Sequence, residues 1–244
     1  QYNMEVCLHM NETLKTWVRE SRRIVFFGGA GVSTESGIPD FRSVDGLYNQ
    51  KYDYPPEEIL SAAFFRRMPE AFFRFYRDKI LKLDAQPNPA HKKLAEWEKE
   101  GKLAAIVTQN IDGLHQKAGS KRVFELHGSI WRNYCVKCGK TYSAEAVAGM
   151  PLVPKCACGG VIRPDVVLYG ESLNGDVINA SLYAIANADL LIVGGTSLNV
   201  YPAAGMIDAY RGDRMVLINK TPTPCDDQAN LIIRDPIGQV FSEL

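Results

Sequence analysis

The amino-acid sequence predicts an α/β protein whose core is a parallel β-sheet. Short, fully apolar runs that suit buried strands alternate with segments of helical periodicity, as in parallel sheets covered by helices. The first such run, residues 24–27, leads directly into the small residues 28–31. Polar residues also gather where the predicted strands end, and in open parallel sheets ligands bind at that edge.

Composition sets the outer limits. The chain has 244 residues, 46% of them apolar, which is enough for one large domain or a large and a small one. Its 28 basic and 28 acidic residues balance, whereas a dedicated nucleic-acid binder carries a basic excess. No run approaches the ~18 apolar residues of a membrane span, and residues 1–10 do not form a secretory signal. We therefore expect no membrane partner, no specific nucleic acid and a cytoplasmic location, and the sequence does not tell whether residues are missing before Gln1.

The expected elements follow from periodicity, caps and breakers. Asn88 and Pro89 supply a cap and a first-turn proline for one helix, and Gly101 ends it. Pro69 divides a strongly aromatic helical stretch whose rings are expected mainly in the core. Residues 43–56 have no steady period and are expected to form a loop over the glycine turn. Helices are expected over 11–21, 57–83, 88–101, within 109–119 and over 181–188, and extended segments over 24–27, 103–108, 123–126, 166–168, 190–193 and 215–218.

The turn after the first strand has the composition of a phosphate-binding loop. Residues 28–31 carry little or no side chain, so a phosphate can approach their backbone N–H groups. Ser33 and Thr34 can cap a following helix. The strict dinucleotide fingerprint has a third glycine where Thr34 stands. On these residues alone, an ordinary glycine-rich loop is an equal alternative.

Four cysteines have the spacing of a metal site. Cys135 and Cys138 are separated from Cys156 and Cys158 by 17 residues. Four thiolates leave no coordination position for water or substrate, which predicts one structural Zn²⁺ per chain. The single residue between Cys156 and Cys158 departs from the usual gap of two and leaves the geometry of that loop open.

Two histidines, His115 and His127, follow predicted strands at the ligand edge. A histidine there can act as a general base near neutral pH. The residues themselves do not choose between the two, and a single histidine is more often structural.

Five motifs and the cysteine module, in this order along the chain, resemble the sirtuins, the NAD-dependent protein deacylases. They are Gly29-Ala30-Gly31-Val32-Ser33 with residues 37–42, residues 108–115, Leu126-His127-Gly128, residues 166–171, and Gly195-Thr196-Ser197 with residues 216–219. The resemblance covers about residues 14–240. It implies a large Rossmann-like domain (1–42, 84–128 and 164–244) with a smaller lobe made of a helical insertion (43–83) and the zinc module (129–163).

The resemblance also implies an activity. A lysine acyl group, most simply acetyl, passes from a protein or peptide to ADP-ribose, and NAD is consumed as co-substrate with release of nicotinamide. It selects His127 as the base, with Asn110 as the second catalytic residue. The acyl-lysine peptide is expected to pair with the free edge of an extended segment. That segment comprises Val166, Val167, Leu168, Tyr169, Gly170 and Glu171, and the family more often has Phe at position 169.

The NAD contacts carried over from the family extend along the whole ligand edge. Asp112 can accept from the nicotinamide carboxamide, although a polar helix cap would explain this motif if it stood alone. Phe41 is expected to shield the nicotinamide end, Arg42 to lie near the phosphates, and Ile237, in a last loop, to contact the adenine through its backbone. The full set is Gly29, Ala30, Gly31, Ser33, Thr34, Asp40, Phe41, Arg42, Gln109, Asn110, Ile111, Asp112, His127, Gly195, Thr196, Ser197, Asn219 and Ile237.

Acyl preference and other functions stay open. Relatives that prefer succinyl or malonyl groups carry a Tyr and, three residues later, an Arg. If Tyr76 aligns with that tyrosine, Lys79 stands three residues later in place of the arginine. A lysine lacks a two-pronged grip on a carboxylate, so neutral acyl groups are favoured. The alternatives are a desuccinylase or demalonylase, and a mono-ADP-ribosyltransferase or NAD glycohydrolase. A non-enzymatic binding module and a dehydrogenase are disfavoured. Protein targets and oligomeric state are not specified by the sequence.

Overall fold

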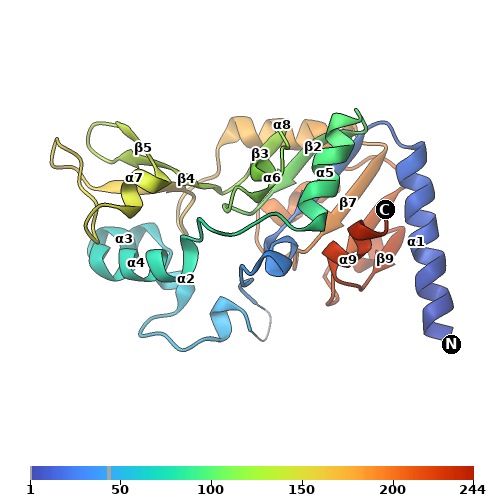
Figure 1. The fold of residues 1–244 in the computed structure, drawn as a ribbon, viewed down its shortest axis with the longest axis horizontal. Coiled ribbons are helices and arrows are strands. Elements are labelled where there is room, and N and C mark those ends of the chain that lie inside the picture. The colour runs from blue at the N-terminus through green and yellow to red at the C-terminus, as the bar shows by residue number, and fades with distance from the viewer. Residues whose placement is uncertain (1, 43–44) are drawn as a thin grey trace.

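Two β-sheets organise the chain (Figure 1). The computed structural model describes residues 2–42 and 45–244, with side chains from residue 11 onward. The predicted loop over the glycine turn includes Ser43 and Val44, which lie outside the described residues. A six-stranded sheet carries the predicted ligand edge, and a three-stranded sheet carries the cysteines.

All neighbouring strands of the larger sheet are parallel, in the order β3-β2-β1-β7-β8-β9. The chain starts in the middle, builds one half of the sheet, and then crosses over to build the other half. This is the strand order of dinucleotide-binding folds, and their ligands lie where the order reverses, here between β1 and β7. The Rossmann-like fold class is therefore confirmed. The strands are β1 (Ile24–Gly28), β2 (Leu103–Thr108), β3 (Val123–Glu125), β7 (Leu190–Gly194), β8 (Met215–Ile218) and β9 (Leu231–Ile233).

Helices cover both faces of this sheet. Alternate strand residues point to opposite faces, so Ile24 and Phe26 pack on one side while Val25 and Phe27 pack on the other. Because both faces are buried, the strands read as continuous apolar runs. No helix in the described part of the chain is long and apolar enough to cross a membrane. The first face is covered by α1 (Tyr2–Glu20), α5 (Pro89–Lys99) and α9 (Ile237–Ser242), and the second by α8 (Gly175–Ala186) and the 3₁₀ helix Ala203–Ala209.

The smaller sheet is antiparallel and lies at the end of the molecule opposite α1 (Figure 1). Its central strand is β4 (Gly128–Cys135), flanked by β5 (Thr141–Ser143) and β6 (Ile162–Val166), and α7 (Ala144–Ala148) follows β5. Short helices gather beside it: α2 (Pro56–Ile59), α3 (Ala62–Arg67), α4 (Pro69–Phe75) and a π-helical turn, Tyr76–Ile80.

The aromatic stretch behaves largely as predicted. The helix is interrupted at Pro69, and it is interrupted again before α3, where Ser61 caps the new helix by accepting from the Phe64 N–H at 3.1 Å. The rings of Phe64, Phe72 and Tyr76 are among the most buried side chains, and they pack edge-to-face or stacked with their neighbours. These rings form the core beneath the short helices.

Several expectations were wrong in detail. Helix α1 begins at Tyr2 rather than near residue 11, and α8 begins at Gly175, with Asn174 as its cap, rather than at 181. The glycine turn leads into two 3₁₀ turns, Ala30–Val32 and Thr34–Ser36, and Ser33 makes no side-chain capping bond. Strand β9 and helix α9 were not predicted, because three and six residues are too short for a clear period. Ile237 therefore lies in the first turn of α9, not in a loop.

Candidate active site

The turns that follow β1 and β7 meet backbone to backbone. Gly29 N donates to Gly194 O at 3.2 Å, and Gly31 N donates to Gly195 O at 2.8 Å. A Cβ on Gly31 would lie 2.8 Å from Gly195 Cα, and Gly195, with φ +58°, would place a Cβ 2.3 Å from Val32 N. Side chains at these positions would push the two turns apart. The glycines therefore build a close junction at the switch point of the sheet.

This junction changes which groups can meet a phosphate. The N–H groups of Gly29 and Gly31 are used between the turns, and those of Val32 and Ser33 are used inside the first 3₁₀ turn. Within the described residues, the N–H of Ala30 makes no intramolecular hydrogen bond. The expectation that the glycine N–H groups themselves are free for a ligand was therefore wrong.

Ser33, Asn110 and Asp112 form a buried polar cluster at the same edge. Ser33 Oγ donates to Asp112 Oδ2 at 2.6 Å, and Asn110 Nδ2 donates to Ser33 Oγ at 3.3 Å. Leu114 N donates to Asp112 Oδ1 at 2.9 Å, and Trp131 Nε1 donates to the backbone oxygen of Asp112 at 2.8 Å. Burial raises the pKa of Asp112, and the hydrogen bonds from Ser33 and Leu114 oppose that rise. These bonds hold the Asp112 carboxylate in a fixed position at this edge.

His91 and His115 lie beneath this cluster, with ring centroids 4.9 Å apart. His91 Nδ1 accepts from Asn88 N at 3.1 Å, so its proton is on Nε2, which is 3.4 Å from Ser33 Oγ. Burial lowers the pKa of His91 to about 4. The contact between His91 and Ser33 was not predicted from the sequence. Its signal was the Asn88-x-x-His91 spacing of a capping box, which the structure contains.

His115 is not available as a base. It is 1% exposed, and both ring nitrogens lack a hydrogen-bond partner among the described residues. Burial, with a smaller contribution from the neighbouring His91, lowers the pKa of His115 well below its ordinary value. A proton acceptor sealed in this way cannot reach a substrate, so of the two candidates left by the sequence only His127 is accessible.

His127 is half-buried and has a defined tautomer. Its Nδ1 lies 3.0 Å from Gln109 O, and because a carbonyl can only accept, Nδ1 carries the proton and Nε2 presents a lone pair. Burial lowers the pKa of His127, with a partial opposing effect from the bond to Gln109. The imidazole is therefore neutral at neutral pH, as a general base requires.

Other predicted residues are held along this edge. Gln109 Nε2 donates to Thr196 Oγ1 at 3.0 Å, which ties the end of β2 to the turn after β7. Ile111 and Ser197, next to these residues, are half-buried. The side chain of Ile237 lies under the β7 end, where a Cβ on Gly194 would come within 2.4 Å of its Cδ1. Asp40 and Phe41 accept backbone bonds from Leu47 and Tyr48, at 2.9 and 2.8 Å.

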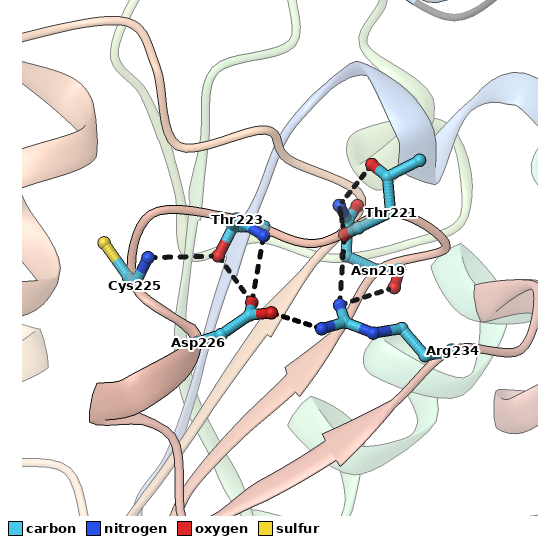
Figure 2. Close-up of polar contacts among 6 residues, drawn as sticks. All are labelled: Asn219, Thr221, Thr223, Cys225, Asp226 and Arg234. Carbon is cyan, nitrogen blue, oxygen red and sulfur yellow. Dashed lines mark hydrogen bonds and ion pairs between the residues drawn. The ribbon is translucent and has the colours of Figure 1, made fainter.

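The loop after β8 is fastened by Arg234 (Figure 2). Arg234 Nη1 donates to Asn219 O at 3.1 Å and to Thr221 O at 3.0 Å, and Nη2 pairs with Asp226. Asp226 in turn accepts from Thr223 N and Oγ1 at 3.0 and 2.9 Å. Asn219 Nδ2 donates back to Thr221 O at 2.9 Å, which fixes the direction of its amide. Asn219 was predicted from the sequence, but Arg234, which holds its loop, was not.

The extended segment 166–171 lies between the two sheets, but its predicted free edge is largely occupied. Val167 N donates to His127 O at 2.9 Å, Leu168 N to Glu171 Oε2 at 2.8 Å, and Tyr169 N to Leu60 O at 3.0 Å. Tyr169 O accepts from Ala62 N at 3.0 Å. The expectation of a free edge along residues 167–169 was wrong, because the start of α3 pairs with it.

Arg163 bonds to both ends of residues 166–171. Its guanidinium donates to both oxygens of Glu171, at 2.6 and 3.0 Å, and to Val166 O at 2.7 Å. The same guanidinium lies over the rings of Phe65 and Tyr134, 5.5 and 5.6 Å from their centroids. The ion pair lowers the pKa of Glu171 against the opposing effect of burial. The carboxylate therefore stays ionised and folds residues 168–171 into a fixed turn.

The four cysteines converge as a metal-binding set. Their sulfur atoms lie within 4.8 Å of one another, and all four are free thiols. Tyr142 Oη donates to Cys156 Sγ at 3.1 Å and Lys137 N donates to Cys135 Sγ at 3.4 Å. These hydrogen bonds orient two of the four sulfur atoms. A Cβ on Gly160 would lie 2.5 Å from Cys135 Sγ, so this loop needs a glycine. The donor set fits tetrahedral Zn²⁺.

Comparison with known proteins agrees with this geometry. The model of the Sir2 family matches residues 29–202. The chain is 58% identical over 232 residues to a Clostridium acetobutylicum protein named NAD-dependent protein deacetylase, covering 93% of this chain and 95% of the relative. It is 56% identical to the protein of the same name from Clostridium perfringens, covering 95% and 96%.

Solved structures extend the likeness to three dimensions. A Sir2 protein with a p53 peptide and NAD⁺ superimposes with a TM-score of 0.84 at 41% identity, and a Sir2 protein bound to an acetylated peptide superimposes with 0.84 at 39%. Each comparison covers 96% of both chains. The sheet order, the accessible histidine, the cysteine set and these matches lead to one conclusion: this chain belongs to the Sir2 family.

Proposed function

We propose that this protein is an NAD-dependent protein-lysine deacetylase, which transfers the acyl group from lysine to ADP-ribose and releases nicotinamide. The observation that carries the proposal is His127, whose Nε2 lone pair is fixed by the bond between Nδ1 and Gln109 O. It follows a strand at the edge that also bears the Ser33–Asn110–Asp112 cluster. The names of the relatives support the same reaction.

The chain's own residues divide the work of binding and proton transfer. The N–H of Ala30 faces the pyrophosphate, because the neighbouring N–H groups are used internally. Asp112 and Asn110 orient the nicotinamide end, and Thr196, Ser197, Asn219 and Ile237 line the adenosine end. His127 Nε2 accepts the proton of a ribose hydroxyl that attacks the acyl carbon. Most of the catalytic contribution is positioning.

The zinc module has a structural role in this proposal. Cys135, Cys138, Cys156 and Cys158 would hold the ion with no open position, so the metal supplies folding free energy and no reactive water. We retain the division into a NAD-binding domain (1–42, 84–128, 164–244) and a smaller lobe (43–83, 129–163). The aromatic cluster of α3 and α4 packs on Ile130 and Val166 of the smaller sheet, which supports the grouping of 43–83 with 129–163. Strand β6 begins in the smaller lobe and continues past the proposed boundary at residue 164.

The acyl group is proposed to be neutral. Lys79 stands where a carboxylate-gripping arginine would be needed, and its Nζ already pairs with Asp78 at 3.2 Å. A succinyl group would have to compete with that aspartate. Tyr76 is 2% exposed, stacks on Phe72 and has no hydrogen-bond partner for its hydroxyl among the described residues. We also propose a cytoplasmic location, since four free cysteines gathered for a metal suit a reducing compartment.

The test is mass spectrometry of an acetyl-lysine peptide incubated with the protein, with and without NAD, following peptide and nucleotide products together. NAD-dependent loss of acetyl with formation of O-acetyl-ADP-ribose is the expected result. A succinyl-lysine peptide of the same sequence is the matched control, and a higher kcat/KM on it would overturn the neutral-acyl preference. ADP-ribose attached to the protein or peptide would favour the mono-ADP-ribosyltransferase, and free ADP-ribose with both peptides untouched would indicate a glycohydrolase.

A further inference from the structure

We propose that Tyr169 is a positioning residue for NAD. Through its hydroxyl bond to Tyr48, it couples residues 166–171, which we call the acyl-lysine segment, to the loop that carries Phe41 and Arg42. The inference rests on the proposed function for what the two ends bind. The bond itself needs a hydroxyl on both rings, which Tyr48 and Tyr169 supply.

The bond is short and joins distant parts of the sequence. Tyr48 Oη and Tyr169 Oη are 2.5 Å apart, although 121 positions separate the two residues in the chain. Burial, followed by the hydrogen bond to Tyr169, raises the pKa of Tyr48 far above its ordinary value. Tyr48 therefore keeps its proton at neutral pH, and either hydroxyl can be the donor.

On one side, Tyr48 supports Phe41 and Arg42. Its ring packs against Phe41 with centroids 5.5 Å apart, and the Arg42 guanidinium lies 5.3 Å from the centre of the same ring. Its backbone N–H also donates to Phe41 O at 2.8 Å. A displacement of Tyr48 therefore moves the two side chains assigned to the nicotinamide end and to the phosphates.

On the other side, Tyr169 is fixed to the acyl-lysine segment. Its N–H and C=O bond to Leu60 and Ala62 at 3.0 Å each, and the Arg163–Glu171 ion pair closes the turn that follows. The Tyr169 side chain is 41% exposed, so the ring reaches outward to Tyr48 instead of packing in the core. Because these bonds fix the segment, they also fix the position of the Tyr169 hydroxyl, and through it that of Tyr48.

Losing the bond should leave the fold intact and loosen the placement of Phe41 and Arg42. KM for NAD should rise about two- to tenfold, the factor that corresponds to one hydrogen bond between partly exposed groups. KM for the acetyl peptide should change less, because residues 166–171 keep their backbone bonds.

The experiment is a double-mutant cycle of Tyr48→Phe, Tyr169→Phe and the double variant, with KM for NAD measured at saturating acetyl-lysine peptide. Both single variants are expected to raise KM for NAD by the same factor, and the double variant by no more than either. Tyr52→Phe is the matched control, because the Tyr52 hydroxyl donates to Gln50 Oε1 at 2.7 Å within the same loop and does not reach the acyl-lysine segment.

The outcomes separate this inference from the proposed function. Unchanged KM for NAD in Tyr169→Phe, or effects of the two single variants that add in the double variant, would overturn the coupling and leave the deacetylase intact. The same increase in Tyr52→Phe would mean that loop packing, not the hydroxyl bond, is measured, and would also overturn it. A wild-type protein with neither turnover nor calorimetric NAD binding would overturn the proposed function and this inference together.

Discussion

The larger and the smaller sheet of this protein are stabilised by different interactions. In the larger sheet all five residues of β1 are buried, and apolar clusters fill both faces. Around the smaller sheet the cluster that includes the four-cysteine set has four buried members, and two of them, Cys135 and Cys156, belong to that set. The larger sheet buries enough apolar surface to fold on that basis, whereas the zinc module has little core without its ion.

This difference explains where function is placed. The carboxyl edge of the larger sheet is built from backbone junctions and buried polar side chains, which need a rigid support that the apolar strands provide. A structural Zn²⁺ contributes about 10–16 kcal/mol in small peptides, so one ion can compensate for the small core at the cysteine end of residues 129–163. Arg163 then joins the two parts, because it comes from β6 and its guanidinium pairs with Glu171 at the end of residues 166–171.

The largest expected effect is therefore loss of zinc. Cys156→Ser should release the metal, unfold the zinc module and abolish deacetylation, while the six-stranded sheet keeps its helices. Zinc content, circular dichroism and activity measure this. Cys225→Ala is the matched control, because Cys225 is a buried cysteine outside the metal set. A Cys156→Ser variant that retains zinc and activity would contradict the comparison between the sheets.

The second effect removes chemistry without touching either core. His127→Ala should lower kcat by about 10²–10⁴-fold, the usual contribution of a general base, with zinc content and melting temperature unchanged. The base must be unprotonated to act, and burial lowers the pKa of His127. Wild-type kcat should therefore persist below pH 6.5 and fall only at lower pH. Full turnover by the alanine variant would remove His127 from its role.

The sequence predicted what depends on local pattern. Strand β2 has the predicted bounds, because five apolar residues followed by Thr108, between Lys102 and Gln109, suit a strand buried on both faces. The cysteine set also follows from spacing alone. Both features depend on neighbours in the chain, so no knowledge of the packing was needed.

The missed features depend on distant partners. Ser33 was expected to cap a helix, but its hydroxyl instead bonds Asp112, 79 residues away. The predicted free edge of residues 167–169 is occupied by Leu60 and Ala62, and the sequence does not indicate that these residues lie beside it. His91 was overlooked for the same reason, since its link to Ser33 appears only when α5 packs under the glycine turn. Tertiary contacts decide these cases.

The third effect tests the junction between the two sheets. Glu171→Gln leaves the buried Arg163 charge without its partner while keeping the shape of the side chain. We expect a loss of stability on the order of 2 kcal/mol, below the ~3–5 kcal/mol seen when a fully buried pair is broken, because Gln still accepts hydrogen bonds. KM for the peptide should rise more than KM for NAD. Glu58→Gln is the control, because its pair with Arg67 is exposed, and an equal response from it would mean that the junction is not special.

The smallest effect concerns the loop clamped by Arg234 (Figure 2). Arg234→Lys keeps the charge opposite Asp226, but an ammonium group cannot also span the Asn219 and Thr221 carbonyls. The loop should loosen at a cost of about 1 kcal/mol, which raises KM for NAD by roughly fivefold at unchanged kcat and unchanged zinc content. Arg67→Lys, at an exposed pair, should change none of these. If KM for NAD stays constant in Arg234→Lys, the adenosine end does not depend on Asn219, and the polar clamp at this edge is as dispensable as a surface ion pair.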